Sequence, residues 1–137
     1  MTLQLDRPRV LATAATGGIT WLCDECHRPI ADGQGYVHIA YSAIRATEAG
    51  QRNWKHEHPG PVYTGADLLT YPAPARWEVH HRRCDPRPTS DDYWFGVERI
   101  RDAADAIEWT SHLTGKTWST DWSGILRAVC SALRGAA

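Results

Sequence analysis

The spacing of apolar residues predicts strands in the first two thirds of the chain. Residues 36–41 alternate in the manner of a half-buried strand and are rich in β-favouring side chains; residues 76–80 are similar. Residues 32–35 contain two glycines and indicate a turn before the first strand. We therefore expect a β-hairpin whose two strands are joined by a long insertion.

Helical spacing appears only after residue 90. Ser90 is a predicted N-cap, because acidic residues fill the turn that follows it. One helix is predicted over residues 91–113, ending before Gly115, from the three-four spacing of Trp94, Val97, Ile100, Ala104 and Ile107. A second helix is predicted to start at Thr120 or Asp121, with one side formed by Ile125, Leu126, Val129 and Leu133.

Two segments lack such patterns. Residues 1–20 are predicted to form an N-terminal arm or an edge strand. Residues 42–75 carry few periodic apolar positions and several prolines and glycines, so a long loop is expected there, with a helical turn near residues 66–69. Loops of this length in compact domains are often functional.

Length and charge narrow the class of protein. A chain of 137 residues is typical of one domain. We expect an α+β fold in which an N-terminal arm (1–20), a β module with its insertion (21–86) and a helical hairpin (87–137) pack together. The net charge of −1 creates no overall field that would attract nucleic acid or a membrane. Residues 1–18 are too polar for a signal peptide, and no stretch resembles a membrane span, so a soluble cytoplasmic protein with reduced thiols is expected.

Cysteine and histidine spacing predicts a metal site. Cys23 and Cys26 form one pair of ligands, and His81 and Cys84 form a second pair far downstream. Three thiolates and one imidazole complete the tetrahedral coordination of a structural zinc ion. His80 remains an alternative to His81, although the spacing to Cys84 favours His81. The fourth cysteine, Cys130, is expected to be a core thiol of the last helix.

Residues 21–86 resemble treble-clef and LIM-type zinc modules, which combine a Cys-x-x-Cys turn with a second ligand pair near a helix start. The resemblance implies a structural zinc ion bound by the four residues named above. The chain departs from these modules in the length of residues 27–80, and it has no second ligand set like that of a full LIM domain.

Two other motifs overlap these residues. Cys23, Cys26 and His27 fit the attachment pattern of c-type haem, which requires an export signal that the sequence does not show. Residues 78–81 after the Cys-x-x-Cys pair resemble the entry to an HNH nuclease. That family needs a later Asn and His, whereas Asn53 lies upstream and His112 lies in a predicted helix.

Histidines and tryptophans outside the metal pairs have structural explanations. His56 and His58 suggest a second metal site or an acid–base pair, but solvated side chains are the favoured interpretation. Most of the seven tryptophans are expected in the core. Trp21 and Trp77 should pack near the metal ligands, and the turn between the helices should be held by Trp109, Trp118 and Trp122. One or two tryptophans are candidates for exposed anchors at an interface.

Basic side chains near Cys84 raise the question of nucleic-acid binding. With Trp77 and Trp94 they offer phosphate contacts and stacking surfaces. Acidic residues are interleaved among them, so a salt-bridged surface is favoured. The arginines concerned are Arg76, Arg82, Arg83, Arg87, Arg99 and Arg101.

The sequence favours a non-enzymatic function. We assign no catalytic residue, because no paired catalytic carboxylates, activated nucleophile or phosphate-binding glycine loop is evident. Residues 109–122 are similar to small uncharacterised proteins of actinobacteria and their phages, a resemblance that implies no activity. We expect a zinc-stabilised regulatory or adaptor protein that presents residues 42–75 to a protein partner. A nucleic-acid-binding zinc protein is the alternative, and a degenerate HNH-like nuclease is a remote one.

Overall fold

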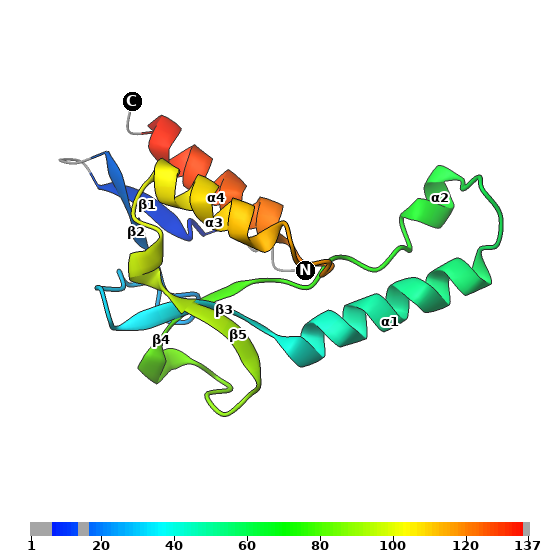
Figure 1. Ribbon diagram of the computed structural model, residues 1–137, viewed down its shortest axis with the longest axis horizontal. Coiled ribbons are helices and arrows are strands. Elements are labelled where there is room, and N and C mark those ends of the chain that lie inside the picture. The colour runs from blue at the N-terminus through cyan, green and yellow to red at the C-terminus, as the bar shows by residue number, and fades with distance from the viewer. Residues whose placement is uncertain (1–6, 14–16, 136–137) are drawn as a thin grey trace.

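The computed structural model describes residues 7–13 and 17–135, which form an α+β fold (Figure 1). Residues 1–6 and 14–16 of the predicted N-terminal arm lie outside the described residues. The α-helices and strands are β1 (Val10–Thr13), β2 (Gly18–Trp21), β3 (Gly35–Ala40), α1 (Tyr41–Glu57), α2 (Gly65–Leu68), β4 (Glu78–His81), β5 (Asp92–Gly96), α3 (Ala103–Leu113) and α4 (Trp122–Gly135). Short 3₁₀ turns follow β4 at Arg82–Cys84 and β5 at Val97–Arg99. Within these described residues, no helix is both long and apolar enough to cross a membrane.

The predicted β-hairpin with a long insertion is confirmed. β3 pairs antiparallel with β4 from Gly35 opposite His81 to His38 opposite Glu78. β5 pairs with the other edge of β3, which gives a three-stranded sheet in the order β4-β3-β5. Close contact at the start of the hairpin requires a glycine, because a Cβ atom on Gly35 would lie 2.3 Å from the carbonyl oxygen of His80.

The prediction of a loop across residues 42–75 is wrong for its first half. Residues 41–57 form α1, a helix of 17 residues. It buries only Ile44 and Trp54, because it extends away from the body of the protein (Figure 1). The apolar periodicity that identifies a core helix is therefore absent, and the helix forms on the strength of its Ala, Arg, Gln and Glu residues. The helical turn predicted near residues 66–69 is confirmed as α2.

Residues 41–75 together form a projecting arm. α1 leads outward, α2 lies near the far end, and residues 69–75 return to the body (Figure 1). The base of the arm is fixed to the turn before α4, where the amide of Gln51 donates to the hydroxyl of Ser119 over 2.8 Å. Backbone hydrogen bonds join Ala75 to Ser119 and Asp121 at the same place.

The single helix predicted over residues 91–113 is also wrong. Residues 92–96 form β5, in which Tyr93 and Phe95 face one side of the sheet and Trp94 faces the other. The apolar residues of this segment fit both a helical and a strand period, and hydrogen bonding to the edge of β3 favours the strand. The helix starts later, at Ala103, where the side chain of Asp102 accepts a hydrogen bond from the backbone of Asp105.

The core lies between the sheet and the two C-terminal helices, with the β1–β2 hairpin beside α4. Trp77 is buried at its centre, 5.2 Å from the ring of Trp122, and donates to the hydroxyl of Thr120. Most tryptophans contribute to this core or pack against it, as the sequence predicts. Trp94 is the exception on the body of the protein, with 59% of its surface exposed.

Two tryptophan variants test how much the core contributes to the free energy of unfolding. Trp77→Ala should lower the free energy of unfolding by about 3–5 kcal/mol, because it empties a large buried site and leaves Thr120 without its partner. Trp94→Ala should change it by less than about 1 kcal/mol, since the ring is mostly in water. Urea denaturation followed by circular dichroism measures both; similar losses for the two variants would contradict this description of the core.

Candidate metal centre

The first pair of thiols lies in a tight turn at residues 22–30, which we call the knuckle. The turn is closed by a backbone hydrogen bond from Cys23 to the carbonyl of Arg28 over 3.0 Å and by one from His27 to the carbonyl of Cys23 over 2.9 Å. His27 has a φ of 60°, a left-handed conformation that non-glycine residues adopt at a cost. The backbone is thus bent so that both thiols face the same side.

The second pair lies where β4 gives way to a 3₁₀ turn. His81 is the last residue of the strand, and the turn at Arg82–Cys84 brings the thiol of Cys84 back over it. The backbone N–H of His81 donates to the sulfur of Cys23 over 3.4 Å, so the two pairs already touch.

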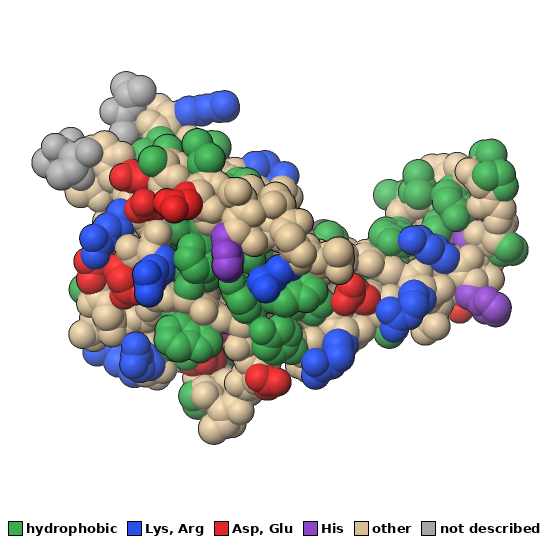
Figure 2. Space-filling model, in the orientation of Figure 1, with side chains coloured by type: hydrophobic (Ala, Val, Ile, Leu, Met, Phe, Trp, Pro, Cys, Tyr) green, Lys and Arg blue, Asp and Glu red, His purple; other side chains and the backbone are tan. Residues whose placement is uncertain are grey.

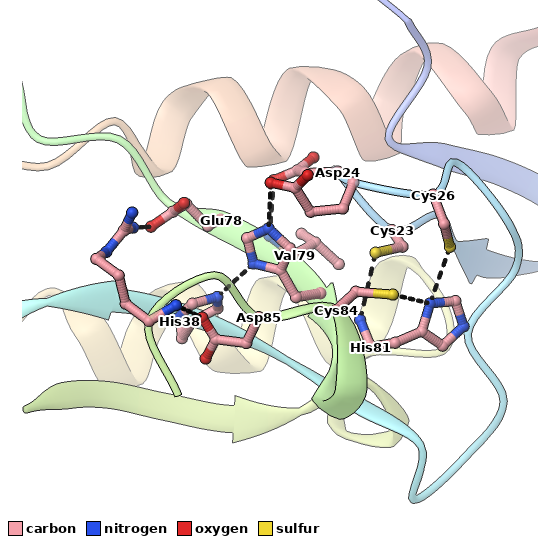
Figure 3. A network of polar contacts seen from close by, with 12 residues as sticks. Cys23, Asp24, Cys26, His38, Glu78, Val79, His81, Cys84 and Asp85 are labelled. Carbon is pink, nitrogen blue, oxygen red and sulfur yellow. Dashed lines mark hydrogen bonds and ion pairs between the residues drawn. The ribbon is translucent and has the colours of Figure 1, made fainter. Parts of the chain in front are cut away.

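The four side chains meet around one point, with all donor atoms within 4.8 Å of one another (Figure 3). The Nδ1 atom of His81 lies 3.3 Å from the sulfur of Cys26 and 3.9 Å from that of Cys84. Sulfur and nitrogen ligands of one tetrahedral zinc ion lie about 3.5 Å apart, given bond lengths of ~2.3 and ~2.0 Å. All four cysteines are free thiols. This Cys₃His group has the composition and spacing to hold a metal ion.

The imidazole of His81 is fixed in the tautomer that a metal needs. Its Nε2 atom lies 3.0 Å from the carbonyl oxygen of Pro29, which can only accept a hydrogen bond. Nε2 therefore carries the proton, and the lone pair of Nδ1 faces the thiols. Metal-binding histidines are commonly oriented by such a contact on the opposite nitrogen.

The electrostatics of the thiols favour a bound cation. A hydrogen bond from the backbone of Arg28 lowers the pKa of Cys26, which favours its thiolate. Burial and the neighbouring thiols of Cys26 and Cys23 raise the pKa of Cys84. A cation among the thiols would offset the burial and the repulsion that disfavour the thiolate of Cys84.

Asp24 holds the two halves together, a role that the sequence pattern does not reveal. Its carboxylate accepts a hydrogen bond from the backbone of Val79 over 2.9 Å, while its own N–H donates to the carbonyl of Val79 over 2.8 Å. Arg9 donates to the same carboxylate over 3.1 and 3.2 Å and to the carbonyl of Trp77 over 2.5 Å. Since Arg9 and Asp24 lie far from residue 79 in sequence, only the folded chain shows this contact.

The structure brings His81 to the thiols and places His80 elsewhere. Successive residues of a strand point to opposite faces. His80 therefore projects to the side of β4 away from the cysteines, where it meets His38. The spacing argument for His81 over His80 agrees with this arrangement.

The remaining predicted site residues are dispersed. His58 stacks on Trp54 within the arm, at 4.2 Å between ring centroids, whereas His56 is exposed on α1, so the two do not form a common site. Cys130 is exposed on α4, which overturns its prediction as a core thiol. The buried face of α4 is formed by Trp122, Ile125 and Val129.

The basic cluster is partly neutralised, and one of its two aromatic residues is inaccessible. Arg87 pairs with Glu78 and Arg101 pairs with Asp32, each over 2.6 Å. Trp77 is buried and has no face available for stacking on a base.

Comparisons of the chain with protein-family models, with curated proteins and with solved structures found no match.

Replacing Asp24 with asparagine tests its role in assembling the centre. Asp24→Asn should weaken metal binding by about 10- to 100-fold, because outer contacts that orient the ligands have effects of this size. Asp32→Asn is the matched control, since Asp32 is an exposed carboxylate whose partner is Arg101. Competition with a chromophoric chelator measures the affinities; equal affinity for both variants would refute the role of Asp24.

Proposed function

We propose that the centre binds zinc and that the ion is structural. Three thiolates and an imidazole are the donors that zinc favours. With four protein ligands, no coordination position is left for a reactive water. The ion would tie the knuckle to the end of β4, two segments separated by residues 27–80. The resemblance to treble-clef modules supports the same assignment.

We propose further that the protein is a non-enzymatic adaptor that binds another protein through the far end of its arm. The observation that carries this proposal is a set of apolar side chains exposed there. Val62 is 84% exposed, Leu69 is 88% exposed and Leu68 is 55% exposed. Figure 2 shows apolar side chains gathered over this end of the molecule. Val62, Leu68 and Leu69 are called the arm tip below.

The arm is built to hold the arm tip in place. The ring of Trp54 lies 4.8 Å from that of Tyr63 and 5.0 Å from that of Tyr71, and its indole N–H donates to Thr70 over 2.8 Å. A capping box between Thr64 and Asp67 fixes the start of α2. Apolar side chains presented by an ordered segment lose little conformational entropy on binding, which favours affinity.

The stem of the arm indicates the chemistry of the partner. Arg45, Arg52 and Lys55 are exposed on α1 between the body and the arm tip. Arg45 and Arg52 are seven residues apart and therefore lie on the same side of the helix. The partner that fits is a protein with an apolar pocket bordered by carboxylates: the pocket receives the arm tip, and the carboxylates speed encounter with the stem.

Nucleic-acid binding is the less favoured alternative. Arg82 and Arg83 are exposed near Cys84 and could contact phosphates. The ion pairs of Arg87 and Arg101 and the burial of Trp77 leave a smaller surface for it than the sequence suggests. An apolar arm tip would also have no part in binding a phosphate backbone.

Loss of one thiol ligand should unfold the protein. Structural zinc contributes about 10–16 kcal/mol, comparable to the whole stability of a domain, so Cys84→Ser should abolish the cooperative thermal transition. Cys130→Ala should change stability by less than about 0.5 kcal/mol, because that thiol is exposed. Elemental analysis should find zinc in the wild type and in Cys130→Ala. A chelator should remove the near-ultraviolet circular dichroism of the tryptophans, and an unchanged signal in metal-free protein would refute a structural ion.

A charge placed at the arm tip should abolish partner binding. In extracts of the source organism, wild-type protein and the double variant Val62→Asp/Leu69→Asp are compared as baits, and any protein lost with the variant is purified. Isothermal titration should then show binding weakened by at least about 30-fold in the variant, since each residue should contribute more than ~1 kcal/mol.

The matched control is Ile107→Asp on α3, which places one such charge at an apolar residue 71% exposed on the body. It should bind like the wild type. Equal binding by the arm-tip variant would overturn the proposal. Self-association of the wild type that the arm-tip variant loses would identify a second copy as the partner instead. Tight binding of mixed-sequence DNA, weakening steeply with salt, would favour the nucleic-acid alternative.

A further inference from the structure

The face of the sheet opposite the thiols carries a second group of metal-ligating side chains. Tyr36 and His38 of β3 point to this face, with His80 of β4 and Asp92 of β5 beside them. His38 and His80 are completely or almost completely buried, with 0% and 1% of their surfaces exposed. Asp85 joins them from the segment after Cys84, and Figure 3 shows it beside His38, on the other side of β4 from the cysteines.

Hydrogen bonds fix the protons of this group. The Nδ1 atom of His38 lies 2.5 Å from the carboxylate of Asp92, which accepts, so in the neutral ring Nε2 bears the lone pair. That Nε2 lies 2.7 Å from Nδ1 of His80, which must donate to it. The Nε2 atom of His80 is then left with a lone pair that faces the carboxylate of Glu25 at 3.8 Å. A lone pair facing an anion is unfavourable, so the network lacks one positive charge.

We infer that His38, His80 and Asp85 form a second binding site, distinct from the Cys₃His centre, for a late first-row divalent ion such as Zn²⁺ or Co²⁺. One donor atom from each residue lies within 4.8 Å of the others. Two imidazoles and one carboxylate are a ligand set that zinc accepts, with water as the fourth ligand.

Binding of the ion resolves the unfavourable contact. The ion takes the lone pairs of His38 Nε2 and His80 Nδ1, and the proton of His80 moves from Nδ1 to Nε2, where it faces Glu25. Each imidazole then has its outer N–H directed at a carboxylate, His38 at Asp92 and His80 at Glu25. This arrangement of carboxylate, imidazole and metal is the usual outer environment of histidine ligands.

The geometry requires only a small adjustment. Nitrogens bound to one tetrahedral zinc ion lie about 3.3 Å apart, so the two rings must separate by about 0.6 Å from their hydrogen-bonded distance. The segment that covers them, residues 82–91, has no long regular element that would prevent this movement.

The charges around the site favour a divalent cation. Asp85 and Asp92 contribute two carboxylates, and the hydroxyls of Tyr36 and Ser90 donate to them. Arg87, the cation of this covering segment that contacts the sheet, is bound to Glu78. Two carboxylates and two neutral imidazoles carry the charge that one divalent ion neutralises.

Cobalt titration of the metal-free protein separates the two sites. Binding at the Cys₃His centre should give a strong near-ultraviolet band from thiolate-to-cobalt charge transfer. A second equivalent should add visible absorption without any increase in that band, because its ligands are nitrogen and oxygen. Elemental analysis of protein loaded with zinc should likewise find a second equivalent. A single equivalent in both experiments would overturn the second site and leave a shared proton between the two histidines.

His38→Gln removes one imidazole ligand while keeping an amide that can donate to Asp92. It should lose the second equivalent and retain the thiolate band, which also reports that the protein is folded. His56→Gln, on the exposed side of α1, is the matched control and should retain both equivalents. Asp85→Asn serves if His38→Gln fails to fold and should also lose the second equivalent. Retention of the second equivalent by a folded form of either variant would overturn the proposal.

Discussion

The docking of the knuckle on β4 is the contact on which the rest of the structure depends. Asp24 binds both backbone polar groups of Val79, and Arg9 anchors that carboxylate from β1's side of the molecule. These hydrogen bonds bring Cys23 and Cys26 to His81 and Cys84 before any ion is considered. This partly buried carboxylate is costly to lose, because the N–H of Val79 and the guanidinium of Arg9 would both lose their acceptor.

Alternation along β4 gives that strand two chemical faces. Val79 and His81 point toward the core and the thiols, whereas Glu78 and His80 point toward a buried polar network. Adjacent residues therefore serve different sites, and β3 supplies the opposite edge of both, through Gly35 against His81 and His38 beside His80. The sheet is small, but a segment covers each face, so polar side chains are buried on a surface that an open sheet would leave in water.

The arm is stabilised differently from the body of the protein. Its contacts are mostly local, between α1 and the residues that follow it, and the ring of Trp54 provides their centre. Burying so little apolar surface, the arm cannot be explained as part of the core. A segment that is ordered, projecting and apolar at its end is typical of an interaction element, and this is why its tip rather than a pocket carries the proposed function.

The sequence alone determined the features that depend on local chemistry. Two cysteines separated by two residues predicted the knuckle, and alternation predicted β3 and β4. Thr120 or Asp121 was predicted as the start of α4, and in the structure Asp121 accepts a hydrogen bond from the backbone of Gly124 there. Only the tertiary structure decided the features that depend on partners distant in sequence. Tyr93 to Phe95 became a strand because the free edge of β3 offered hydrogen bonds that a helix there would not use. The sequence did not predict α1, because a helix with few buried side chains has no helical period of apolar residues. The sequence likewise did not predict the contacts of Asp24, His38 and His80, because hydrogen bonds between distant segments do not affect the spacing of residues along the chain.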